Sequence, residues 1–116
     1  MAYDNNNIFA KILRHEIPSF FIYEDTYVVA FYDIHPRAAT HVLVVPKKAY
    51  TDYNDFITRA TQDEIVNILT DIKKVADFLG LIDSGYRIVV NVGAGAGQEV
   101  PHLHFHILSD QKTSHH

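Results

Sequence analysis

Cysteine is absent from this chain of 116 residues. Its absence excludes a disulfide framework and any zinc site built from thiolates, and it is typical of proteins in a reducing compartment. Long apolar runs are missing too: no stretch approaches the length of a membrane span, and no basic segment followed by an apolar one opens the sequence. We therefore expect a cytoplasmic protein that is neither exported nor inserted in a membrane.

Positive charge is scarce and scattered. The chain has 10 Lys and Arg against 14 Asp and Glu, which gives a formal net charge of −4 at pH 7. A protein that binds nucleic acid normally carries a clustered basic surface that neutralises phosphates. We expect no nucleic-acid partner, and any phosphate group must be bound locally.

Apolar residues, by contrast, are sufficient for a core. They make up 47% of the chain and include 7 Phe and 7 Tyr, so the chain can fold without disulfides or a structural metal. The length fits a single domain, residues 1–116, in which we expect frayed tails at residues 1–6 and 110–116.

Apolar spacing predicts two helices. Residues 8–14 place Ile8 and Ile12 on one face of a short amphipathic helix. Thr61 and Glu64 form a capping box, in which each side chain accepts a hydrogen bond from the backbone amide of the other. Apolar residues then keep the helical period as far as Gly80, which offers a left-handed cap, so we expect one long helix there.

Aromatic and β-branched residues predict five strands, at residues 20–23, 27–32, 41–45, 86–92 and 102–108. Turn-forming residues predict a hairpin between the first two, and we expect irregular chain in the dozen residues after Pro46. Together these elements predict an α+β fold. It would be a five-stranded, mostly antiparallel sheet with a short N-terminal helix and one long helix, the helices being packed on one face.

The most informative segment is His-Leu-His-Phe-His-Ile-Leu at residues 102–108. Alternate side chains of a strand share a face, so His102, His104 and His106 would form a row with neighbours about 6.5 to 7 Å apart. The apolar residues between them would fill the core. Three imidazoles in such a row could act together on one ligand.

Three interpretations fit this row. The histidines could be surface residues of an edge strand, although such strands usually carry Thr, Lys and Glu. They could bind a metal ion, since His-X-His offers two imidazole ligands and a third could complete a site. They could also perform phosphoryl or nucleotidyl transfer, in which a neutral imidazole attacks phosphorus and its neighbours hold or protonate the oxygens.

A glycine-rich segment just upstream favours the third interpretation. Residues 91–98 read Asn-Val-Gly-Ala-Gly-Ala-Gly-Gln, and glycines let backbone amides turn toward an anion without a Cβ penalty. The loop would bring amide donors, Asn91 and Gln98 close to the imidazoles.

This combination resembles the signature of the histidine triad (HIT) family. Segments at residues 7–12, 16–18, 31–34 and 40–47 resemble the branch of histidine triad nucleotide-binding proteins, also called Hint-like. The resemblance spans residues 7–108. It implies a HIT-like fold and a homodimer in which two protomers share one continuous sheet.

The resemblance implies catalytic roles for four histidines. His104 matches the nucleophile that takes up the nucleotidyl group, and His106 matches the histidine that contacts the phosphate and the leaving group. His102 and His41 would support the row by hydrogen bonds, which decide the tautomer that the attacking imidazole presents.

The other matched positions concern the nucleotide. Asp33 matches the acidic residue that accepts the ribose hydroxyls. The apolar residues around the base, which could equally be ordinary core, would be Phe9, Ile12, Ile17, Phe31, Ile34 and Leu43. The phosphate site would be lined by Asn91, Gly97, Gln98, Glu99 and Val100.

The chain departs from the family pattern in three places. Ala49 replaces a histidine that binds structural zinc together with cysteines in some relatives, so we expect no metal and no other cofactor. Glu99 replaces a hydroxyl residue, and the C-terminal tail is short, so leaving-group selectivity does not carry over. We exclude His115 and His116 from the site.

The resemblance therefore implies a hydrolase or nucleotidyl transferase. It would cleave purine nucleoside phosphoramidates or aminoacyl-adenylate-type substrates through a covalent nucleotidyl-histidine intermediate. Its partners would be purine nucleoside monophosphate conjugates and a second copy of the chain. The alternatives are a dinucleoside polyphosphate hydrolase, a metal-binding protein and a nucleotide-binding interaction module.

Overall fold

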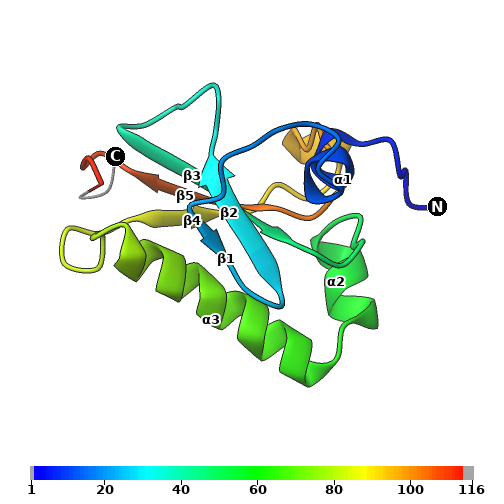
Figure 1. Cartoon of the computed structure of the whole chain (residues 1–116). Helices are drawn as coiled ribbons and strands as arrows, with labels where there is room; N and C mark the ends of the chain where they lie inside the picture. The colour runs from blue at the N-terminus through cyan, green and yellow to red at the C-terminus, as the bar shows by residue number, and fades with distance from the viewer. Residues whose placement is uncertain (1, 114–116) are drawn as a thin grey trace.

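The computed structural model describes residues 2–113, which form both helices and strands. In chain order they are α1 (Ile8–Leu13), β1 (Tyr23–Glu24), β2 (Val28–Tyr32), β3 (Thr40–Pro46), α2 (Tyr53–Arg59), α3 (Gln62–Phe78), β4 (Arg87–Val89), the 3-10 helix η1 (Ala94–Ala96) and β5 (Phe105–Ser109). The strands form one sheet in the order β1-β2-β3-β5-β4, and each neighbouring pair is antiparallel (Figure 1). The predicted α+β fold is confirmed.

The two faces of the sheet are covered by different helices. Val28 and Ala30 of β2 pack in the larger core, beneath α3, which runs along one face (Figure 1). Val29 and Phe31 of the same strand pack with Phe9 of α1 in a second core. The prediction that both helices share one face is wrong, because consecutive apolar residues in β2 make both of its faces apolar and each needs cover.

The long helix begins as predicted. The Thr61 hydroxyl accepts from the Glu64 amide at 3.1 Å, and the Thr61 amide donates to the Glu64 carboxylate at 2.9 Å. After the helix, Gly80 has a φ of 75°, the left-handed conformation that glycine adopts without strain. Leu69 is 47% exposed and lies outside the buried stripe.

The segment after Pro46 contains a helix that we did not predict. In α2, the Asp52 side chain caps the first turn by accepting from the Asp55 amide at 2.8 Å. The Arg59 guanidinium forms an ion pair at 2.6 Å with Asp55, one turn earlier in the helix. Phe56 of the same helix is fully buried. Irregular chain was the wrong prediction here, since a cap, an ion pair at helical spacing and one apolar anchor were present.

The strand that carries the histidines begins later than predicted. It starts at Phe105, so His102 and His104 precede it. In the register of β3 with β5, Val44 pairs with Phe105, which places Pro46 opposite Leu103. Proline has no amide hydrogen to donate, and the Leu103 amide bonds instead to the Tyr50 carbonyl at 2.8 Å. The two edge strands are also shorter than predicted, β1 at its start and β4 at both ends.

Both segments that we expected to be frayed make contacts where the structure describes them. The Tyr3 hydroxyl is bonded to His102, and the buried Thr113 donates to the Leu79 carbonyl at 2.8 Å. The Thr40 hydroxyl donates to the carbonyl of Gln111 at 2.6 Å. Residues 114–116, with His115 and His116, lie outside the described residues. Among the described helices, none is long and apolar enough to cross a membrane.

Candidate active site

A cavity of about 690 Å³ lies on the α1 side of the sheet and brings together most of the predicted site residues. Residues from α1, the chain before β1, the ends of β2, and the glycine-rich segment form its walls. The predicted residues that line it are Phe9, Ile12, Ile17, Phe31, Asp33, Ile34, Leu43, Asn91, Gly97, Glu99, Val100, His104 and His106. His41, His102 and Gln98 do not line it.

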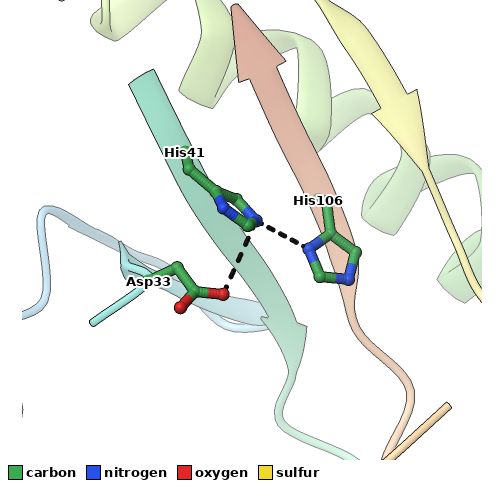
Figure 2. Close-up of side chains that lie close together, drawn as sticks. All are labelled: Asp33, His41 and His106. Atoms are coloured by element: carbon green, nitrogen blue, oxygen red, sulfur yellow. Dashed lines mark hydrogen bonds and ion pairs between the residues drawn. The ribbon is translucent and has the colours of Figure 1, made fainter. Parts of the chain in front are cut away.

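His41 and His106 are hydrogen-bonded to each other across two neighbouring strands. Figure 2 shows His41 on β3 pointing toward His106 on β5, with Nε2 of the first 2.8 Å from Nδ1 of the second. The backbone amide of Arg37 donates to His41 Nδ1 at 3.1 Å, and an amide can only donate, so the His41 hydrogen is on Nε2. His41 therefore donates to His106, and the remaining hydrogen of a neutral His106 is on its Nε2. That atom is buried and has no hydrogen-bond partner among the described residues.

His104 presents the opposite tautomer. Its Nδ1 lies 2.7 Å from the carbonyl oxygen of His102. A carbonyl can only accept, so Nδ1 carries the hydrogen and Nε2 keeps its lone pair. The ring centroids of His104 and His106 are 5.1 Å apart. One cavity wall thus holds a nucleophilic nitrogen beside an imidazole N–H donor.

Burial keeps all four histidines neutral at pH 7. Loss of hydration is the largest cause in each case. It lowers the pKa of His102 and of His106 from 6.5 to about 4. It also lowers the pKa of His104 and of His41, although the charge of Asp33 partly opposes the effect. A neutral His104 is the form that can attack an electrophile.

The predicted row of three equivalent imidazoles is only partly present. The alternation itself holds, because Leu103, Phe105 and Ile107 all pack in the core beneath α3. His102, however, is fully buried, with Nε2 donating to the Pro46 carbonyl at 2.7 Å. Two histidines therefore face the cavity, and His102 supports them from behind.

Gln98 and the glycine-rich segment differ from the expected anion cradle. The Gln98 side chain accepts from the Gly93 amide at 2.8 Å and donates to the carbonyls of Thr51 and Val100. Backbone amides within the segment are also bonded internally, those of Ala96, Gly97 and Gln98. Gln98 thus holds the segment in shape instead of lining the cavity, and Gly97, with a φ of 84°, needs to be glycine for its backbone conformation.

The nucleotide-binding residues of the prediction surround the imidazoles. The Phe9 ring meets the His104 ring edge to face, with centroids 4.8 Å apart. Asp33 accepts from the His35 amide through one oxygen, and its other oxygen lies 3.5 Å from His41 Nε2 (Figure 2). Ile34 is 83% exposed at the cavity, so its apolar side chain is open to a ligand and is not core.

Sequence reasoning missed several residues of the cavity wall, namely Ile8, Pro18, Ser19, Tyr32, His35 and Arg37. Ile8, Pro18 and Tyr32 lie within the segments 7–12, 16–18 and 31–34 that carry the resemblance, and continuity along the chain could have suggested them. Arg37 contributes the backbone amide that orients His41, and no side-chain pattern encodes such a contact.

Asp33, His41 and His106 could also hold a metal ion. One ligand atom from each lies within 4.8 Å of the others, and two imidazoles with a carboxylate are a known zinc donor set. A metal would need the lone pair of His41 Nε2, where the structure places the hydrogen that is donated to His106. Binding must therefore displace this proton and break the hydrogen bond between the two rings.

Comparison with known proteins agrees with this geometry. A family model described as the HIT domain matches residues 14–113. The chain belongs to the HIT family. A HIT-like protein of Azospirillum brasilense is 48% identical over 96% of this chain and 91% of its own length. The purine nucleoside phosphoramidase of Escherichia coli is 40% identical over 87% of this chain and 84% of its own length.

A solved HIT family structure has the same fold. The HIT family hydrolase from Clostridium thermocellum superposes with a TM-score of 0.79 and is 38% identical, covering 91% of each chain. The HIT domain match begins at residue 14. In this HIT protein, α1 and the residues before it therefore lie outside the matched region, although Phe9 and Ile12 of α1 line the cavity.

Proposed function

We propose that this HIT protein hydrolyses purine nucleoside phosphoramidates, or related aminoacyl adenylates, through a covalent nucleotidyl intermediate on His104. One observation carries the proposal: a histidine whose Nδ1–H is bound by a backbone carbonyl, leaving the Nε2 lone pair free at a cavity wall. The name of the Escherichia coli relative supports the same class of substrate.

The proposed reaction uses two histidines with opposite tautomers. The Nε2 lone pair of His104 forms a bond to phosphorus while the bond from phosphorus to the leaving nitrogen breaks. The leaving nitrogen takes the Nε2 hydrogen of His106, whose Nδ1 is bonded to His41. Water then attacks phosphorus, the bond from phosphorus to His104 Nε2 breaks, and one proton of the water returns to His106 Nε2 as the nucleoside monophosphate is released. Positioning and charge stabilisation account for most of the rate in phosphoryl chemistry.

The walls of the cavity suit the rest of the nucleotide. Asp33 can accept the two ribose hydroxyls, since a carboxylate offers several acceptor sites. The apolar residues around it, Phe9, Phe31 and Ile34 among them, would pack on the faces of the base. These roles extend the proposal from the reacting atoms to the recognition of the nucleoside.

A substrate panel with trapping of the intermediate tests the proposal. Adenosine and guanosine phosphoramidates should be hydrolysed faster than dinucleoside polyphosphates, and brief mixing with labelled substrate should leave nucleotide bound to His104. His104→Ala should lose turnover while nucleoside monophosphate binding persists. The control His15→Asn removes an imidazole outside the cavity, at a φ of 61° that Asn tolerates, and should stay active. Substantial turnover by His104→Ala would remove His104 from the nucleophile role.

The other candidate functions give different results in the same assays. A dinucleoside polyphosphate hydrolase would reverse the order of the panel. A nucleotide-binding interaction module would bind nucleotide without forming the intermediate. A metal-dependent site at Asp33, His41 and His106 would lose activity on exhaustive chelation and regain it with zinc, whereas the proposed reaction survives chelation.

A further inference from the structure

The N-terminal segment reaches the back of the catalytic histidines through Tyr3. The Tyr3 hydroxyl lies 2.5 Å from His102 Nδ1, and the two rings meet edge to face with centroids 5.6 Å apart. The side-chain amide of Asn7 donates to the Tyr3 oxygen at 2.8 Å. Neither Tyr3 nor Asn7 lines the cavity, so their effect on the site must pass through His102.

The backbone fixes the direction of these hydrogen bonds. His102 Nε2 carries a hydrogen, because its partner is the Pro46 carbonyl, which can only accept. A neutral His102 then has its lone pair on Nδ1, and the Tyr3 hydroxyl must donate to it. Burial supports this arrangement, since it lowers the pKa of His102 to about 4 and raises the pKa of Tyr3, so that both are neutral at pH 7.

We propose that Tyr3 is a positioning residue for the reaction on His104. Tyr3 and the Pro46 carbonyl hold the two nitrogens of His102 from opposite sides. The carbonyl of the same residue, His102, accepts the Nδ1 hydrogen of His104. Fixing the ring of His102 therefore fixes the acceptor that sets the tautomer and orientation of His104. The inference rests on the proposed function, in which Nε2 of His104 attacks phosphorus.

A purely structural role would be to anchor the N-terminal segment to α1. Asn7 does this independently of Tyr3, because its Oδ1 caps α1 by accepting from the Ala10 amide at 2.8 Å. The two roles can therefore be separated by variants that keep the cap of α1 and break the bond between Tyr3 and His102.

Tyr3→Phe removes the hydroxyl and keeps the ring. We expect kcat on an adenosine phosphoramidate to fall roughly tenfold, the lower end of what loss of an orienting partner costs at other sites. KM should change less than about twofold, since Tyr3 does not contact the cavity. The control Tyr27→Phe removes a hydroxyl that bonds Asp63 at 3.3 Å, outside the cavity, and should behave as wild type. An unchanged kcat in Tyr3→Phe would overturn the proposal.

Nitrogen-15 NMR of the imidazoles tests the same link without any substrate. In Tyr3→Phe, the Nδ1 signal of His102 should move toward that of an unbonded lone pair, and the Nδ1–H signal of His104 should shift with it. Unchanged His104 signals would overturn the positioning role. Because this measurement needs no turnover, it still decides the inference if the wild type hydrolyses no phosphoramidate and the proposed function fails.

Asn7→Asp provides a second variant that keeps the phenol ring. The new carboxylate can still cap α1, although the bond that the Asn7 amide donates to the Asp4 carbonyl at 2.7 Å is lost. The carboxylate accepts from the Tyr3 hydroxyl instead of donating to it, which withdraws that hydrogen from His102. We expect the same change in the His102 and His104 signals as in Tyr3→Phe. Wild-type signals in Asn7→Asp, with the fold intact by circular dichroism, would also count against the inference.

Discussion

His41 donates from Nε2 to Nδ1 of His106, and this bond leaves the hydrogen of a neutral His106 on its Nε2. The two residues come from neighbouring strands in diagonal register, since His41 pairs with Leu108 and His106 with Leu43. The direction of the bond is set by the Arg37 amide on the far side of His41. His41 does not line the cavity, so we expect it to affect a ligand there through the tautomer of His106.

Replacing His41 should lower the rate of the chemical step. In His41→Leu, His106 Nδ1 loses its donor, and part of the population carries the hydrogen on Nδ1 instead of Nε2. We expect kcat on a phosphoramidate to fall roughly 10- to 100-fold, less than the roughly 10²- to 10⁴-fold that a positioned proton donor contributes, because part of the population keeps the Nε2 hydrogen. The control is Thr40→Val, on the same strand as His41. It removes a hydroxyl that is bonded to the Gln111 carbonyl and should retain kcat. Equal kcat values for the two variants would contradict this role.

Glu99 should influence the choice of leaving group. It is exposed at the cavity, where a carboxylate would attract a cationic amine and repel an anionic one. Attraction at such an exposed position is worth about 1 kcal/mol, or several-fold in relative rate, and weakens with salt. The measurement compares wild type with Glu99→Ser on matched phosphoramidates of cationic and neutral amines. If the ratio of the two kcat/KM values is the same in both proteins at low salt, Glu99 has no part in selectivity.

Asp71 should make stability fall as pH rises. It is buried on α3, and burial together with the neighbouring Asp25 raises its pKa from 3.8 to about 7. Folding therefore favours the protonated form, and this contribution is lost as pH rises from about 4 toward 7. Asp71→Asn stays neutral, so its Tm relative to wild type should increase from pH 5 to pH 8. The exposed Asp77→Asn on the same helix should show no such trend, and a pH-independent difference for Asp71→Asn would contradict the assignment.

The protein should form a homodimer. The outer edge of β4 has no partner strand among the described residues, and Ile88 on that strand is 54% exposed. On α3, Val66 and Leu69 are 62% and 47% exposed. An unpaired strand edge, together with exposed apolar residues on a helix, favours pairing with a second copy. Light scattering at micromolar concentration should give twice the chain mass, and Leu69→Asp should reduce it, whereas the control Ile57→Asp on α2 should not. A monomer mass for wild type would refute the prediction.

Patterns within single segments predicted much of the fold and of the site. The capping box at Thr61 and the alternation of residues 102–108 both depend on residues a few positions apart, and both hold. The start of β5 depends on Pro46, which faces Leu103 only after the strands have paired. The histidine tautomers depend on contacts of the same kind, such as that of His41 with the Arg37 amide. Residues and periods are visible in a sequence, whereas the partner of a hydrogen bond across the sheet is not.

The reliance of the histidines of this site on main-chain partners affects how the site can evolve. A backbone group orients each of three histidines. The Pro46 carbonyl orients His102, the His102 carbonyl orients His104, and the Arg37 amide orients His41. Substitution by any residue except proline changes a side chain but leaves the peptide carbonyl and amide in place. Position 37 can therefore change to any residue except proline and still supply the amide that orients His41. Insertions, deletions and a proline at position 37 would be the damaging class of change, because they move or remove that backbone group.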